Sequence, residues 1–197
     1  MADLLKGARI GCAMTGSFCM FSETFNAFRA LRDAGAELFP IMSENAYSLD
    51  TRFFEAKEAR RIFAELCGRE IMHTIPDVEP IGPKHLFDLL IVAPATGNTL
   101  AKLANGIADT SVTLAVKSHL RNGNPALLAV STNDGLARNA KNIGAIMSMR
   151  HFYFVPYSQD APDGKPTSVV AHMPLIPEAA EKALARAQLQ PLIRESH

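Results

Sequence analysis

The segment Leu86-Phe-Asp-Leu-Leu-Ile-Val-Ala93 is apolar at nearly every position, and Pro94-Ala-Thr-Gly-Asn-Thr99 follows it directly. A continuous apolar run of this length is typical of a strand covered on both faces, as in a parallel sheet between helix layers. The polar hexapeptide predicts that the strand ends in a turn and that a helix begins there. The same succession recurs along the chain, and it decides the fold.

The rest of the chain alternates between strands and helices. Further apolar stretches predict strands at 8–14, 36–42, 126–131 and 152–155. Apolar residues at helical spacing predict helices after residue 17, from about 97, and at 52–67, 110–121 and 135–149. This alternation predicts an α/β fold, a three-layer Rossmann-like (flavodoxin-like) parallel sheet with helices on both faces.

The 197 residues are expected to form a single domain, 1–197. A stretch rich in Asp, Gly and Pro predicts a long loop at about 157–172. Pro177 and the helix-spaced pair Glu178 and Lys182 predict a C-terminal helix at about 177–190.

Composition argues against several classes of function. Lysine plus arginine and aspartate plus glutamate number 20 each, so the net charge is zero, whereas nucleic-acid binding normally needs a basic excess. No apolar run is long enough to span a membrane. The three cysteines, Cys12, Cys19 and Cys67, lack the spacing of metal ligands and favour a reduced, cytoplasmic protein without a metal site.

Short polar residues follow four of the predicted strands. They are the segments 15–17, 43–45, 94–99 and 131–135. In parallel sheets ligands bind beyond the carboxyl ends of the strands, so these segments are expected to line one crevice. Gly16 and Gly97 would allow a ligand to approach the backbone. Amides at helix N-termini, with the hydroxyls of Ser17, Ser43 and Thr99, suit a phosphate group.

Each of these segments, taken alone, is also explained as a helix cap or a tight turn, and only their occurrence at four strand ends favours a ligand site. Two common nucleotide motifs are absent. No G-x-G-x-x-G follows a strand, and Gly164-Lys165 lacks the first glycine of a P-loop.

Residues 94–110 resemble the FMN-binding signature of the flavoprotein family that includes the homo-oligomeric flavin-containing cysteine decarboxylases and the phenylacrylate-type flavin prenyltransferases. That signature is Pro-Ala-Ser-Ala-Asn-Thr followed by an Ala-Lys helix, and here Thr96 and Gly97 replace Ser and Ala. The resemblance covers roughly residues 7–160. It implies a homo-oligomer, a trimer or dodecamer, and FMN held by Gly16, Ser17, Ser43, Pro94, Ala95, Thr96, Gly97, Asn98 and Thr99.

Three further runs, at 117–122, 130–136 and 139–144, resemble one branch of this family. Its members are B subunits that act with a separate, NAD(P)-binding A subunit in spore-forming bacteria. The resemblance implies an oxidoreductase of the mother-cell cytoplasm that oxidises a dihydrodipicolinate to dipicolinate (pyridine-2,6-dicarboxylate), with NADP or NAD on the partner protein.

A flat dicarboxylate needs hydrogen-bond donors spread around its ring. Asn133, the amide of Gly135, Arg138 and Lys141 lie in or after the last of the four polar segments and are the substrate candidates. Arginine pairs with carboxylates through two parallel hydrogen bonds. A solvated helix face explains Arg138 and Lys141 equally well. No catalytic residue can be assigned.

The chain departs from the decarboxylases at their catalytic histidine, which precedes the signature proline by fourteen residues. That position holds Pro80, whose side chain cannot transfer a proton. The Met-Trp turn of the decarboxylases is also missing, since the chain has no Trp. Two alternatives stay open: a stand-alone FMN-dependent decarboxylase or flavin prenyltransferase, and a scaffold protein that has lost its cofactor.

Overall fold

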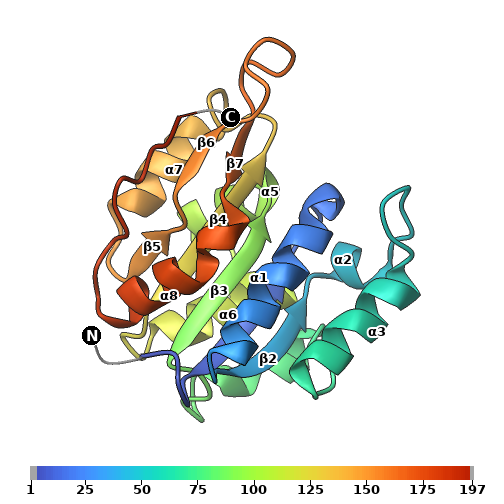
Figure 1. The fold of residues 1–197 in the computed structure, drawn as a ribbon. Helices are drawn as coiled ribbons and strands as arrows, with labels where there is room; N and C mark the ends of the chain where they lie inside the picture. The colour runs from blue at the N-terminus through green and yellow to red at the C-terminus, as the bar shows by residue number, and fades with distance from the viewer. Residues whose placement is uncertain (1–3, 196–197) are drawn as a thin grey trace.

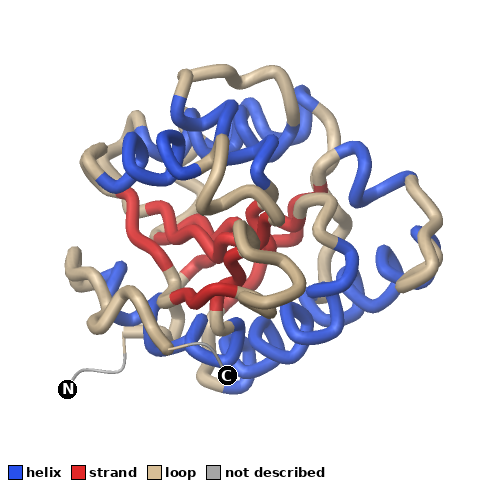
Figure 2. The backbone as a smooth tube through the Cα atoms, turned by 90° about the horizontal axis from the view of Figure 1, so that it is seen from above, coloured by secondary structure: helices blue, strands red, loops and turns tan. Residues whose placement is uncertain are grey.

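The computed structural model describes residues 4–195 of the chain. At its centre lies a mainly parallel sheet, which Figure 2 shows between two layers of helices. Its parallel strands stand in the order β2-β1-β3-β4-β5. In chain order these strands are β1 (Arg9–Met14), β2 (Glu37–Met42), β3 (Leu89–Ala95), β4 (Ala126–Thr132) and β5 (Phe152–Phe154). This flavodoxin-like order confirms the predicted α/β fold and places a reversal of strand order between β1 and β3.

Strand β4 changes its neighbour along its length. Its first residues pair with β5 in parallel, whereas Ser131 and Thr132 pair antiparallel with β7 (Val169–Ala171). Strand β7 pairs in turn with β6 (Tyr157–Gln159), and the loop of this hairpin projects beyond the sheet in Figure 1. The carboxyl end of β4 is therefore bordered by the β6–β7 hairpin.

Helices cover both faces of the sheet (Figure 1). One face carries α1 (Phe21–Asp33) and α8 (Ile176–Leu184), with α3 (Ala56–Cys67) beside α1. The other carries α5 (Gly97–Ala104), α6 (Ser111–Leu120) and α7 (Ala140–Met147). The shorter described helices are α2 (Glu44–Ser48), α4 (Ile75–Val78) and the 3₁₀ helices Phe18–Met20, Glu79–Ile81 and Met173–Leu175. Within residues 4–195, none of the helices has the length and apolarity needed to cross a membrane.

The core lies between the sheet and its two helix layers. All seven residues of β3 are buried, as the opening apolar run predicts. On the α1 face, Phe28 of α1 stacks on Phe63 of α3 with ring centroids 5.8 Å apart. In β1, a Cβ on Gly11 would come within 2.7 Å of Phe87 and Leu90, so only glycine lets these side chains pack over the strand.

The structure corrects the predicted loop at 157–172. This range contains β6 and β7, and the loop between them covers only 160–168. The end of β4 extends past its contact with β5 and leaves backbone groups open for pairing, which β7 satisfies. Each hairpin strand is three residues long, too short for a periodic pattern in the sequence.

The predicted helices at 177–190 and 135–149 are also shorter in the structure. Helix α8 ends at Leu184, and Gln188 beyond it bonds to both backbone groups of Phe154 in β5. Helix α7 begins at Ala140 because the Asp134 carbonyl accepts from the amides of Ala137 and Asn139 and so forms a turn before it. The predicted helix at 52–67 begins only at Ala56.

Candidate functional site

The ends of β1 and β3 are joined by the buried side chain of Thr15. Its hydroxyl donates to the carbonyl of Pro94 at 2.7 Å and accepts from the amide of Thr96 at 3.1 Å. Only 2% of Thr15 is exposed, so these hydrogen bonds form away from water. They fix the turn after β1, with Gly16 and Ser17, against the start of α5 at the point where the strand order reverses.

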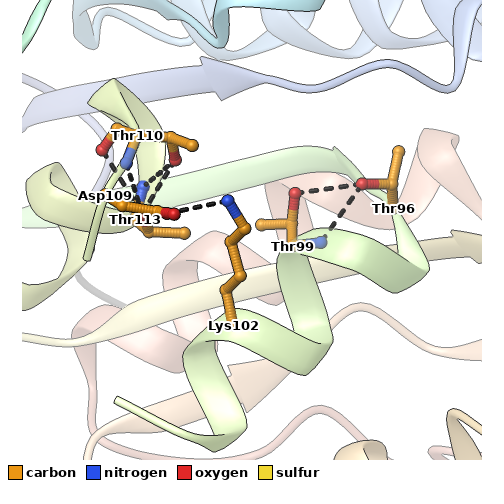
Figure 3. Close-up of polar contacts among 6 residues, drawn as sticks. All are labelled: Thr96, Thr99, Lys102, Asp109, Thr110 and Thr113. Atoms are coloured by element: carbon orange, nitrogen blue, oxygen red, sulfur yellow. Dashed lines mark hydrogen bonds and ion pairs between the residues drawn. The ribbon is translucent and has the colours of Figure 1, made fainter. Parts of the chain in front are cut away.

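Helix α5 begins with a capped turn (Figure 3). The hydroxyl of Thr96 accepts from the amide of Thr99 at 3.4 Å and lies 3.0 Å from the Thr99 hydroxyl. The first intrahelical bond runs from Leu100 to the Thr96 carbonyl, so the amides of Gly97 and Asn98 precede it and lack an acceptor within the helix. This helix end therefore offers two donors and the positive end of a helix dipole.

The far end of α5 is tied to the start of α6, as Figure 3 also shows. Lys102 pairs with Asp109 at 2.7 Å, and its side chain is only 22% exposed. The adjoining Thr110 and Thr113 form a reciprocal capping box at the start of α6. Lys102 is thus held by a carboxylate of its own chain, and its hydrogen bond keeps α5 in place.

A polar network packs against Gly97 from the side of β4. The carboxylate of Asp134 accepts from the hydroxyl of Thr132 at 2.6 Å. It also accepts from the side-chain amide (Nδ2) of Asn139, at 2.8 Å and 2.9 Å to its two oxygens. The Thr132 hydrogen bond, followed by that of Asn139, holds the pKa of Asp134 below its ordinary value, although burial acts in the opposite direction. A Cβ on Gly97 would lie 2.5 Å from Thr132 Oγ1 and from Asn139 Nδ2. Gly97 is therefore required by packing within the chain.

A cavity of about 1460 Å³ opens where β1, β3 and β4 end. From the strand ends it is lined by Gly16, Ser17, Thr96, Gly97 and the segment 131–133. Between β1 and β4, the hydroxyls of Ser17 and Ser131 lie 2.7 Å apart. The cavity exceeds the roughly 300–1,000 Å³ of ordinary ligand pockets, so it has room for two molecules side by side.

The structure brings together only part of the predicted cofactor site. Ser43 lies at the same edge, since its amide bonds to the Met14 carbonyl, but its hydroxyl caps α2 and it does not line the cavity. Pro94 and Ala95 are buried in β3, and the Thr99 hydroxyl faces Thr96. Asn98 is exposed, outside the lining.

Of the substrate candidates, only Asn133 lines the cavity. Gly135 packs against Val169, where a Cβ would meet that side chain at 2.2 Å. Arg138 and Lys141 are exposed and lie outside the cavity lining of the single chain.

Several lining residues were not predicted from the sequence. Phe53, which falls within the predicted helix at 52–67, instead precedes α3, is 48% exposed and lines the cavity. The predicted site consists mainly of short polar residues after the strands, yet the cavity is also lined by the charged residues Glu23, Asp160, Lys165, Arg194 and Glu195. They come from α1, the hairpin and the C-terminal segment, which carry no motif. Among residues 4–195, no group of three or more His, Cys, Asp or Glu is placed to hold a metal ion.

Comparison with known proteins places the chain in a family. The model of the flavoprotein family matches residues 2–173. The B subunit of dipicolinate synthase from Bacillus subtilis (strain 168) is 42% identical over 193 residues, which cover 98% of this chain and 96% of that protein. The chain belongs to the flavoprotein family, in the branch of the dipicolinate synthase B subunits. The sequence resemblance carried by residues 94–110 and the three later runs is thereby confirmed.

Solved structures agree with this relationship. The crystal structure of the dipicolinate synthase B subunit from Bacillus halodurans C has a TM-score of 0.90 and 36% identity, covering 98% of this chain and 99% of that one. The FMN-dependent cysteine decarboxylase SpaF has a TM-score of 0.67 and 22% identity, covering 91% of this chain and 98% of that one. The B subunits thus share their fold with FMN-dependent enzymes.

Proposed function

We propose that this chain works as the B subunit of a dipicolinate synthase and, together with an NAD(P)-binding partner protein (the A subunit), oxidises dihydrodipicolinate to dipicolinate in the cytoplasm of a sporulating cell. The observation that carries the proposal is the 42% identity to the B subunit of Bacillus subtilis across nearly the whole of both chains. The cavity at the strand ends supplies the room that such a reaction needs.

The reaction removes two electrons and two protons from the dihydropyridine ring. A hydride passes to NAD(P)⁺, and the second proton is released as the ring becomes aromatic. The chain lacks the glycine fingerprint of a dinucleotide site, so we assign the NAD(P) to the partner protein. Aromatisation of the ring supplies the driving force.

The donor set of the cavity fits FMN. The unpaired amide of Gly97 and the hydroxyls of Ser17, Thr96 and Ser131 line the cavity and would hold a phosphorylated ring ligand, with the Asn98 amide and Ser43 at the same edge. When bound, FMN would supply a two-electron carrier in the cavity, able to pass the same electron pair on to the NAD(P)⁺ of the partner protein. The 1460 Å³ volume leaves space for a substrate beside it.

For the substrate we retain Asn133, which lines the cavity. Gly135 is packed against Val169, whereas Arg138 and Lys141 are exposed outside the cavity of one chain and would reach a ligand only across a boundary between two chains. We therefore propose that the chain acts as a homo-oligomer that also binds the NAD(P)-binding partner protein.

The stand-alone decarboxylase receives no support from the site. Pro80, which stands in the position of the catalytic histidine, lies in the 3₁₀ helix Glu79–Ile81 and does not line the cavity. The nearby His73 and His85 do not line it either.

Reconstitution tests the proposal. The chain, its NAD(P)-binding partner protein, dihydrodipicolinate and NADP or NAD are combined with and without FMN, and dipicolinate is quantified by chromatography. We expect product only when both proteins are present, and Ser131→Val to reduce it while Ser148→Val, at the exposed end of α7, does not. Full activity of either protein by itself would contradict the proposal.

A further inference from the structure

The segment after α8 runs along the outside of the sheet and pairs with the backbone of β5 and β6. Gln188 forms two hydrogen bonds with the backbone of Phe154, of 2.8 and 2.7 Å. Farther on, the Tyr157 amide donates to the carbonyl of Leu192 and the Arg194 amide donates to the carbonyl of Tyr157, both at 3.0 Å. The chain end thus pairs in parallel with β6, and Figure 1 shows its dark-red trace passing beside that strand. This pairing fixes the position of Arg194.

Arg194 lines the same cavity as the strand ends. Its Nε atom is buried and has no hydrogen-bond partner among the described residues, and Arg194 takes part in none of the ion pairs found within 4–195. The other lining cation of fixed charge, Lys165, is already paired with Asp160 at 3.0 Å and is 57% exposed. Arg194 is therefore the lining cation that the described residues leave without a carboxylate.

Arg194 is partly buried and has no carboxylate partner among the described residues, so an anion in the cavity could pair with its guanidinium through a charge-assisted hydrogen bond. The guanidinium offers parallel donors that match a carboxylate in geometry. Glu23 and Glu195 also line the cavity and disfavour a ligand of high negative charge near them, unless a cation such as Arg194 receives it.

We propose that Arg194, delivered to the cavity by the pairing of the C-terminal segment with β6, binds one carboxylate of the dicarboxylate substrate and selects diacids over monoacids. The inference rests on the proposed function, because it takes the substrate to be a dihydropyridine dicarboxylate whose oxidation product is pyridine-2,6-dicarboxylate. Arg194 acts as a specificity-determining residue for that substrate.

Calorimetric titration of the full-length chain tests this. Pyridine-2,6-dicarboxylate, pyridine-2-carboxylate and FMN are each titrated into the wild type, Arg194→Gln, Arg194→Lys and the control Arg150→Gln. Arg150 is exposed, lies outside the cavity and takes part in no described ion pair. Loss of a charge-assisted hydrogen bond predicts about 10- to 100-fold weaker binding of the diacid to Arg194→Gln. The preference for diacid over monoacid should collapse, and FMN affinity should stay unchanged.

Arg194→Lys keeps the positive charge but loses the parallel N–H donors of the guanidinium, so this variant should bind the diacid with intermediate affinity. Equal diacid affinity in the wild type and Arg194→Gln would overturn the inference, as would a parallel loss of FMN binding. A wild-type chain that binds no diacid, and forms no dipicolinate with its partner protein, would instead overturn the proposed function itself. Thermal melting of all four proteins identifies any variant whose fold is lost. If Arg194→Gln does not fold, the diacid affinity of Arg194→Lys, compared with that of the wild type, tests the inference instead.

Discussion

Replacement of Gly97 by alanine is expected to destabilise the protein, although both residues are small. The new methyl group would lie 2.5 Å from Asn139 Nδ2 and from Thr132 Oγ1, and 2.9 Å from Asp134 Oδ1. All three atoms belong to one hydrogen-bonded network whose longest link measures 2.9 Å. The network cannot move aside without stretching bonds to a carboxylate.

Overpacking of this kind costs about 1–3 kcal/mol, and weakening of a hydrogen bond to a charged group adds to it. We expect the free energy of unfolding to fall by about 2–3 kcal/mol, which for a chain of this size lowers Tm by about 4–12 °C. Differential scanning calorimetry at neutral pH measures the change.

Gly144→Ala is the matched control. Gly144 lies within α7, and a Cβ there would meet nothing within 4 Å. Alanine is the better helix former by about 1 kcal/mol, so Tm should rise by about 2–4 °C in this variant. An unchanged or raised Tm in Gly97→Ala, with the expected rise in Gly144→Ala, would refute the packing argument.

Three further predictions concern other buried or lining groups. Thr15→Val removes the hydroxyl that joins the ends of β1 and β3, leaves two backbone groups without a partner, and should cost about 2–4 kcal/mol in chemical denaturation. Burial lowers the pKa of His119 to about 4, below its ordinary 6.5. Between these two pH values the unfolded chain binds more protons than the folded chain, so the free energy of unfolding decreases as the pH is lowered. Between pH 7 and 5 this loss should be about 2 kcal/mol, and it should be largely absent in His119→Gln; equal losses would contradict it. Cys19 is the exposed thiol in the cavity lining, so a thiol reagent should modify one site per chain quickly, FMN should slow it, and Cys19→Ser should abolish it.

The sheet could be predicted because its central strands are long and apolar at nearly every position. The runs that became β3 and β4 are buried along nearly their whole length, and no other element explains such a pattern. Thr96 and Ser43 cap helices, so their positions after strands also served as start signals. Ser43 shows the limit of this signal. It lies at the edge of the sheet where the strands end, but its hydroxyl caps α2 and does not face the cavity.

The remaining parts depend on contacts that leave no local pattern. The hairpin strands β6 and β7 are three residues each and exist because the end of β4 needs a neighbour. Arg194 enters the cavity because Gln188 and Tyr157 pair with distant backbone, which sequence spacing cannot reveal. From the sequence, Gly97 was predicted to let a ligand approach the backbone. In the structure it is required because the hydrogen-bonded side chains of Thr132, Asp134 and Asn139, more than thirty residues later in the chain, pack against it.

A crystal structure of the chain grown with FMN and pyridine-2,6-dicarboxylate tests the central claim most directly. We predict both molecules in the cavity at the ends of β1, β3 and β4, with the flavin phosphate on the amides at the start of α5 and a carboxylate on Arg194. Density for either ligand elsewhere on the chain, with this cavity holding only water at saturating ligand, would contradict it.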